Sequence, residues 1–193
     1  QSNVLIHPLC TTVEANAFSG ITVLDANYTI DVNNVTNFKE KSFYSNRANI
    51  VINKPIKELG NQCFYNCTGF PNTVQLDSTL TEIGENAFSY VNITSINLPN
   101  SLIEIKNSAF SGCRQLTSVT LPDSLTTLGD AVFSYCTALE TVVFPNSITS
   151  VGYNVFGSTP YLSTLRQQGS LIIINNNIII IIFFNTTESF SIL

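Results

Sequence analysis

Hydrophobic residues recur along this chain at regular intervals, and one phenylalanine marks each repeat. The marker residues are Phe18, Phe43, Phe64, Phe88, Phe110, Phe133 and Phe156, separated by 21 to 25 residues. A period of roughly 20 to 50 residues is the signature of a repeat architecture, in which each unit packs on its neighbours. The spacing therefore predicts a stack of about seven similar coils.

Three more hydrophobic columns accompany the marker phenylalanine. Five residues before it stand Val13, Phe38, Leu59, Ile83, Ile105, Leu128 and Val151. Directly before it stand the small or medium residues Ala17, Ser42, Cys63, Ala87, Ala109, Val132 and Val155. Eight residues before the last six markers stand Val35, Ile56, Leu80, Leu102, Leu125 and Ile148. Four columns that hold across the copies predict a shared buried core.

The sixth copy shows the local structure that each coil is expected to adopt. Val119 and Leu121 alternate with Thr120, a pattern that predicts a short strand with one buried face. The glycine at 129, which recurs at 60, 84 and 152, predicts a sharp backbone turn. Residues 130–136 are predicted to form one or two helical turns that place Phe133 and Cys136 on one face.

Stacking gives these coils a core that none of them could close alone. Parallel strands in adjacent coils lie about 4.8 Å apart, so successive marker rings should lie directly over one another. The repeat therefore predicts an α/β solenoid with parallel strands and a column of phenylalanine rings inside it.

Residues 121–145, LPDSLTTLGDAVFSYCTALETVVFP, resemble the BspA-like class of leucine-rich repeat, found in surface proteins of mucosal bacteria and parasitic protists. The resemblance extends over residues 8–165 and is close from Leu76 onward, whereas Lys39 and Lys106 replace the glycine in two copies. It implies a right-handed leucine-rich repeat superhelix. It also implies a non-enzymatic protein at the cell surface or secreted, with a role in adhesion to host cells, matrix proteins or other microbes.

We expect the solenoid to occupy residues 1–166 and an apolar capping segment to occupy residues 167–193. At the first end, Leu5, Ile6 and Leu9 are expected to cover the open coil. At the other end, Leu171 and Ile174 follow Ile148 and Val151 by one period of 23 residues, which predicts a degenerate eighth coil.

The segment from 171 to 184 allows three interpretations. A membrane-spanning helix needs about 20 apolar residues, whereas this segment has fourteen and is interrupted by three asparagines. Two strands could instead turn at the asparagines and close the solenoid end. Alternatively, the aliphatic edge could pair with a second chain, making a homodimer through residues 171–184.

Composition argues against several classes of function. The net charge is −5 and the eight Lys and Arg residues are scattered, which disfavours nucleic acid as a partner. His7 is the one histidine, and no catalytic or cofactor motif accompanies it. We interpret Glu82, Glu104, Asp130 and Glu140 as occupying different positions of the coil, so no repeated acid pair or metal site is expected. The sequence therefore predicts neither catalysis, nor a cofactor, nor a metal.

The five cysteines do not form a disulfide framework in a chain of this length. Cys113 and Cys136 stand at the same position of adjacent copies. The prediction is that they are buried thiols acting as small apolar fillers.

Candidate ligand-binding residues lie between the buried positions of the expected strands. They are Thr73, Gln75, Ser95, Asn97, Ser118, Thr120, Thr141, Val143, Thr164 and Arg166. This face is rich in hydroxyl and amide groups and is uncharged apart from Arg166. It could bind protein ligands, or its Ser and Thr could simply favour strands. Two hypotheses follow: an adhesion or protein-binding module that uses this face, or a self-associating structural protein that uses its aliphatic C-terminal end.

Overall fold

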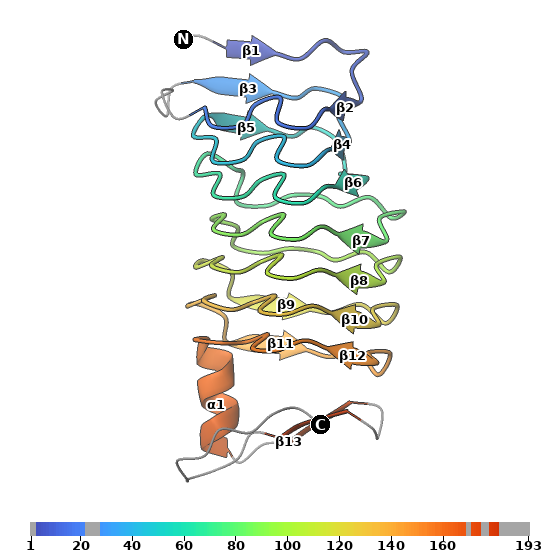
Figure 1. Ribbon diagram of the computed structural model, residues 1–193, viewed down its shortest axis with the longest axis vertical. Coiled ribbons are helices and arrows are strands. Elements are labelled where there is room, and N and C mark those ends of the chain that lie inside the picture. Colours follow the sequence, from blue (N-terminus) through green and yellow to red (C-terminus); the bar gives the residue numbers. More distant parts are fainter. Residues whose placement is uncertain (1–2, 22–27, 169–170, 175–177, 182–193) are drawn as a thin grey trace.

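The coils stack in a single column from the N-terminal strand to a C-terminal helix (Figure 1). The computed structural model describes residues 3–21, 28–168, 171–174 and 178–181 of the chain. Each coil in this column carries one marker phenylalanine, so we number the coils one to seven in chain order. The predicted solenoid is confirmed.

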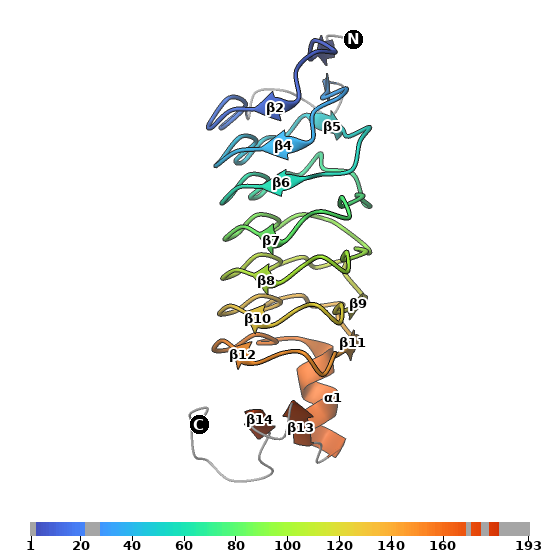
Figure 2. The same cartoon turned by 90° about the vertical axis from the view of Figure 1, so that its right-hand side faces the viewer.

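Short parallel strands line two sides of the column, as seen in the view of Figure 2. The first side carries β1 (Asn3–Leu5), β3 (Thr29–Asp31), β5 (Asn49–Val51), β9 (Ser118–Thr120) and β11 (Thr141–Val143). The second side carries β2 (Thr12–Val13), β4 (Asn37–Phe38), β6 (Glu58–Leu59), β7 (Glu82–Ile83), β8 (Glu104–Ile105), β10 (Thr127–Leu128) and β12 (Ser150–Val151). We call these the first and second sheet faces.

The marker phenylalanines form one continuous stack inside the coils. Successive ring centroids lie 4.9, 5.7, 5.9, 5.4, 5.4 and 5.8 Å apart from Phe18 to Phe156, and all six pairs are stacked. The five inner rings are fully buried. The interior column predicted from the repeat is therefore confirmed.

The predicted helical turn around each marker is wrong. Its backbone has positive φ both two residues before and two residues after the phenylalanine, as at Ala131 (φ 52°) and Tyr135 (φ 60°). The N–H groups of Ser108, Phe110 and Gly112 donate to carbonyls of the next coil at 2.8 to 3.0 Å. The intervening N–H groups bond within their own coil. A helix would use all these donors internally, whereas here alternate donors link the coils.

The recurring glycine has a different role from the predicted sharp turn. A Cβ built on Gly129 would lie 2.6 Å from the amide nitrogen of Asn107 in the preceding coil. Neither Gly129 nor Gly152 has a positive φ. Close approach of two backbones, rather than turn conformation, therefore requires glycine at this position.

Helix α1 (Pro160–Gln168) follows the last coil. Thr159 begins it, since its Oγ1 accepts a hydrogen bond from the N–H of Leu162 at 3.1 Å and Pro160 is suited to the first helical position. The Tyr161 ring packs edge-on against Phe156, with centroids 5.2 Å apart. The helix therefore covers the end of the ring stack and crosses the predicted domain boundary at residue 166, which itself stays a prediction.

Beyond the helix, β13 (Leu171–Ile174) and β14 (Ile178–Ile181) pair antiparallel. This confirms the strand pair, whereas the degenerate eighth coil and the closing of the solenoid end stay predictions. Pairing with a second chain stays a prediction. Among the described residues, no helix has the length and hydrophobicity to cross a membrane.

The prediction for the N-terminal end is wrong for two of its three residues. Leu5 is 65% exposed and Leu9 is 84% exposed, so neither covers the first coil. Ile6 is partly buried and packs against the core. Strand β1 pairs on one side only, with β3, because it is the edge of its sheet.

Candidate functional site

The predicted binding residues of the sixth and seventh coils lie on the first sheet face. Strands β9 and β11 pair in register, with Ser118 opposite Thr141 and Thr120 opposite Val143. These four side chains are exposed, whereas Val119 and Val142 between them are buried. The alternation predicted from the sequence is confirmed here.

In the fourth and fifth coils the face is present but the sheet is not. Thr73, Gln75, Ser95 and Asn97 are exposed on either side of buried residues, as predicted. Their backbones, however, do not form strands. The neighbouring Thr94 N–H donates to the Asn72 carbonyl at 2.9 Å. The prediction of strands at these residues is therefore wrong for these two coils.

The face also extends into coils that sequence reasoning left out. Thr29 and Asp31 of β3 pair with Asn49 and Val51 of β5 at the equivalent positions. Val51 is 38% exposed. The repeat lengths of 25 and 21 residues in this part of the chain obscured the correspondence. Searching for polar–apolar–polar triplets, without a fixed period, could have found these residues.

Thr164 and Arg166 do not belong to this face. Both lie within α1, so the prediction that they continue the strand ladder is wrong. Thr159 and Pro160 start a helix where the next strand of the face is expected. A helix presents residues at intervals of three and four rather than two. The first sheet face therefore ends with β11.

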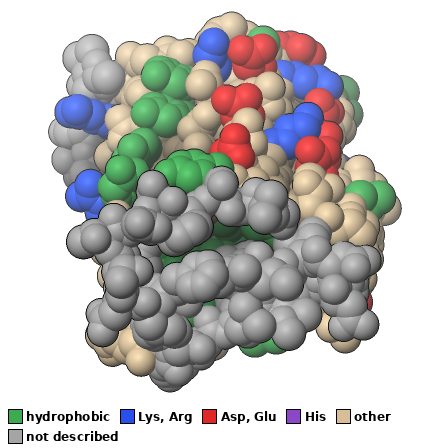
Figure 3. All heavy atoms as spheres, turned by 60° about the horizontal axis from the view of Figure 1, so that its bottom comes forward, with side chains coloured by type: hydrophobic (Ala, Val, Ile, Leu, Met, Phe, Trp, Pro, Cys, Tyr) green, Lys and Arg blue, Asp and Glu red, His purple; other side chains and the backbone are tan. Residues whose placement is uncertain are grey.

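Charge collects on the second sheet face instead. Lys39 Nζ lies 2.6 Å from Glu58 Oε1, and Lys106 Nζ lies 2.6 Å from Glu82 Oε1. The hydrogen bond to Glu82 raises the pKa of Lys106, and the surrounding carboxylates add to this effect. Figure 3 shows acidic and basic side chains intermingled on one part of the surface.

The two lysines that replace the repeat glycine thus form ion pairs with a neighbouring coil. Glu82 and Glu104 are direct register partners in β7 and β8. The prediction that these two carboxylates occupy different positions of the coil is therefore wrong. Lys106 compensates their mutual repulsion.

The buried cysteines are hydrogen-bond donors as well as fillers. The thiols of Cys113 and Cys136 donate to the carbonyls of Phe88 and Phe110, each at 3.1 Å, and Cys67 donates to Phe43 at 2.7 Å. Each bond joins a cysteine to the marker phenylalanine of the preceding coil. Burial raises the pKa of Cys67 to about 12. These bonds therefore link adjacent coils, and the Cys67 thiol is a poor nucleophile.

We expect the thiols to differ sharply in reactivity. Cys10 is exposed, whereas Cys63, Cys67, Cys113 and Cys136 are buried and free. Ellman's reagent at pH 8 should modify one thiol per native chain at once and all five after denaturation, because only unfolding exposes the others to the reagent. Rapid reaction of two or more thiols in the native chain would contradict this burial. A Cys10→Ser variant, which should show no rapid phase, is the control.

The one histidine lies outside the strands of the first sheet face. His7 is exposed in the loop after β1, and its Nδ1 accepts a hydrogen bond from the Leu9 N–H at 3.3 Å. Among the described residues, no group of three His, Cys, Asp or Glu side chains is arranged to hold a metal ion.

Comparison with known proteins places this geometry among leucine-rich repeats. The family described as "BspA type Leucine rich repeat region" matches residues 2–72 and 57–186, with six copies of the repeat. A leucine-rich repeat protein of T. pallidum is similar in structure, with a TM-score of 0.67, 24% identity, and coverage of 87% of this chain and 83% of that one.

A leucine-rich repeat protein from Bacteroides ovatus ATCC 8483 is also similar, with a TM-score of 0.62 and 24% identity. That match covers 82% of this chain and 49% of the other, so the chain spans about half the length of the Bacteroides protein. At these identities the likeness concerns the fold alone. A search of curated proteins found no match.

Proposed function

Because the chain belongs to the BspA-type leucine-rich repeat family, we propose that it is a non-enzymatic protein-binding module at the cell surface or secreted. Its ligands are proteins of host cells or of the extracellular matrix. Its contact surface is the first sheet face. The proposal rests on the chemistry of that face and on what the family resemblance implies.

One observation carries the choice of surface: the two sheet faces differ in charge. In the sixth and seventh coils the first face presents Ser118, Thr120, Thr141 and Val143, all uncharged and exposed. The ion pairs of Lys39 and Lys106 lie on the second face, where each side chain already has a partner. Unpaired hydroxyl groups on a regular scaffold are better placed to accept a ligand.

The chemistry of the face favours recognition by hydrogen bonds and shape. Short hydroxyl side chains on strands lose little conformational entropy when they bind. The exposed positions of the sixth and seventh coils are uncharged, and Asp31 in β3 is a charged member of the face. With so little charge, electrostatic steering is weak, so the affinity should depend only weakly on salt concentration. A ligand would lie along the coils and contact the same two positions in each one.

A charge-insertion variant tests this surface. Combining Ser118→Asp, Thr120→Asp and Thr141→Asp should reduce capture by immobilised matrix proteins at least roughly a hundredfold, because each carboxylate desolvated without a partner costs about 1–3 kcal/mol. Surface plasmon resonance against purified matrix proteins and binding to intact host cells would measure the loss.

The matched control places the same charge on the other side of the same coils. This control combines Thr127→Asp, Thr149→Asp and Ser150→Asp, which lie on the second sheet face or directly before its strands. It should leave capture unchanged. If the first-face variant captured matrix proteins as well as the control variant and the wild type do, the first sheet face would be rejected as the contact surface. Loss of binding in both would point to damaged folding, which circular dichroism of each variant would reveal.

A further inference from the structure

The strand ladder of the second face is interrupted at one place in the column, between the third coil (marker Phe64) and the fourth coil (marker Phe88). The first-face ladder also stops here and resumes only at β9, although Ile56 and Leu76 still form a parallel bridge across the junction. On the first face, β5 is the last strand of its sheet. On the second face, β6 ends one sheet and β7 begins another, so that the two are not paired. We call this junction the seam.

A specific pair of hydrogen bonds is missing at the seam. At the other junctions, two consecutive N–H groups donate to one carbonyl of the preceding coil, as Ile103 and Glu104 do to Thr81 at 2.8 and 3.2 Å. At the four other junctions, an equivalent pair of N–H groups donates to the carbonyls of Thr11, Thr36, Ile103 and Thr126. At the seam the equivalent donors are Thr81 and Glu82. Within the described part of the chain, neither bonds to the Lys57 carbonyl.

A side-chain contact is rearranged at the same place. In the regular coils a serine hydroxyl reaches back to the preceding coil, as when Ser101 donates to the Leu80 carbonyl and Ser124 to the Leu102 carbonyl, each at 2.6 Å. Thr79 holds the equivalent position at the seam. Its hydroxyl donates instead to Asp77 Oδ1 at 2.6 Å, within its own coil. The Asp77 N–H takes over the link to the Ile56 carbonyl at 2.8 Å.

The charged side chains also divide at the seam. Glu58 pairs with Lys39 of the second coil, and Glu82 pairs with Lys106 of the fifth coil. Each carboxylate therefore bonds away from the junction. Glu58 and Glu82 occupy the same position of adjacent coils, where like charges directly opposite each other are destabilising.

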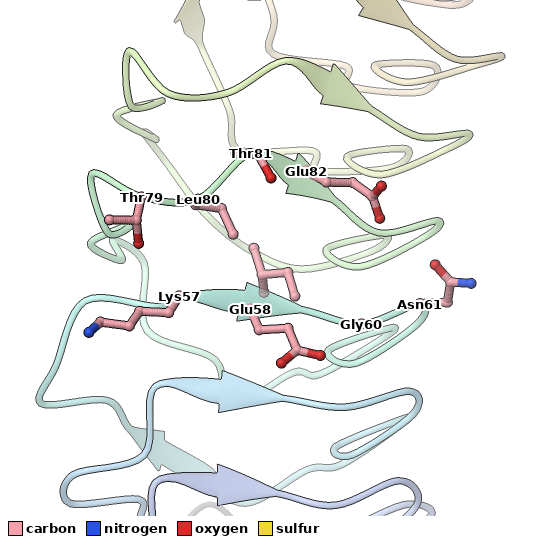
Figure 4. A pocket seen from close by; sticks show the side chains of 9 residues that line it. Lys57, Glu58, Gly60, Asn61, Thr79, Leu80, Thr81 and Glu82 are labelled. Atoms are coloured by element: carbon pink, nitrogen blue, oxygen red, sulfur yellow. The ribbon is translucent and has the colours of Figure 1, made fainter.

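A polar cavity of about 200 Å³ lies where these contacts are missing. Lys57, Glu58 and Asn61 line it from one coil, and Thr79, Thr81 and Glu82 line it from the other (Figure 4). Water in such a space weakens the interface between the coils, because it competes for their backbone groups.

The two coils remain hydrogen-bonded along the loops that carry the marker phenylalanines. Gln62, Phe64 and Asn66 donate from their N–H groups to the fourth coil at 2.7, 3.0 and 2.8 Å, as at regular junctions. The phenylalanine stack also crosses it, with Phe64 and Phe88 5.9 Å apart. The loop edge of the junction is therefore fully bonded. On the strand side, the Gly84 N–H still donates to the Leu59 carbonyl at 3.1 Å and Ile56 still bridges to Leu76, but the pair of bonds to the Lys57 carbonyl is missing. A junction that is bonded more weakly on one side than on the other has the geometry of a hinge.

We propose that the solenoid consists of two cooperative units, residues 3–70 and 72–168, which open and bend relative to each other at the seam. In a repeat protein, stability is the sum of unit terms and nearest-neighbour interface terms, so cooperativity breaks first at the weakest interface. Bending here changes the spacing between Val51 and Thr73 on the first sheet face. The inference concerns the fold and does not depend on the proposed function.

Native-state hydrogen exchange in increasing urea tests the proposal. Amides of the first three coils should converge on one opening free energy and urea dependence, and amides of the last four coils on another. The boundary between the two groups should fall at the seam. A single group for all coils, or a boundary at another junction, would overturn the proposal.

A repair variant tests the cause. Regular coils carry Pro and Ser where the fourth coil has Asp77 and Thr79, as at Pro99 and Ser101. Asp77→Ala with Thr79→Ser removes the carboxylate that holds the hydroxyl and keeps the backbone N–H bond of position 77 to the Ile56 carbonyl. The freed hydroxyl can then add a second bond to that carbonyl, so the two exchange groups should merge. The control is Thr149→Ser, the same type of change at an exposed residue of the seventh coil. It should leave the two exchange groups separate. Groups that remain separate in the repair variant would overturn the altered contacts as the cause of the division.

Discussion

Replacing Phe110 by alanine is expected to lower the free energy of unfolding by about 3–5 kcal/mol. Its ring is fully buried and stacks between Phe88 and Phe133, with centroids 5.4 Å away on each side. Both neighbours are held by their own coils and cannot move into the space. The substitution therefore leaves a cavity in the middle of the column, and urea unfolding followed by circular dichroism would measure its cost.

The control for this cavity is Tyr135→Ala in the adjacent coil. Tyr135 is 53% exposed, so truncating its ring removes little buried surface and should change stability by less than about 1 kcal/mol. A Phe110 variant no less stable than the Tyr135 variant would contradict the contribution to stability that we assign to the phenylalanine stack.

Adding one methyl group at Gly152 is expected to cost about 1–3 kcal/mol through overpacking. Its Cβ would lie 2.5 Å from the Asp130 amide nitrogen and would also clash with the Gly129 carbonyl carbon of the preceding coil. These contacts are with backbone, which moves only if the coils separate. Thermal unfolding of Gly152→Ala should show the loss as a lower melting temperature.

Lys106→Ala provides the comparison at the same position of another coil. That coil already accommodates a Cβ, and its N–H bond to the Ile83 carbonyl is 3.0 Å long, against 2.8 Å for Gly152 to Leu128. Loss of the exposed Lys106–Glu82 pair should cost less than about 1 kcal/mol. A Gly152→Ala variant as stable as the wild type would show that the coils can shift apart at little cost.

The candidate site was predictable where the repeat is regular. Ser118, Thr120, Thr141 and Val143 could be assigned to a face because strand residues alternate about a buried valine. The same reasoning failed at Thr164 because a local signal, the Thr159–Pro160 helix start, overrode the period. It also failed to recognise Glu82 and Glu104 as partners, although each stands six residues before its marker phenylalanine, and counting from the marker would have revealed the pair.

The sequence by itself determined that the chain forms a stack of coils, because a hydrophobic residue that recurs once per period can be buried only against its counterpart in the next coil. It also identified the phenylalanine column and the polar positions between buried ones. The tertiary structure decided what depends on contacts between coils. These are the backbone approach at Gly152, the positive φ on either side of each marker, the thiol bonds to the preceding coil, and the seam between Phe64 and Phe88. Such features arise from distances between segments about 23 residues apart, which no local pattern of residues specifies.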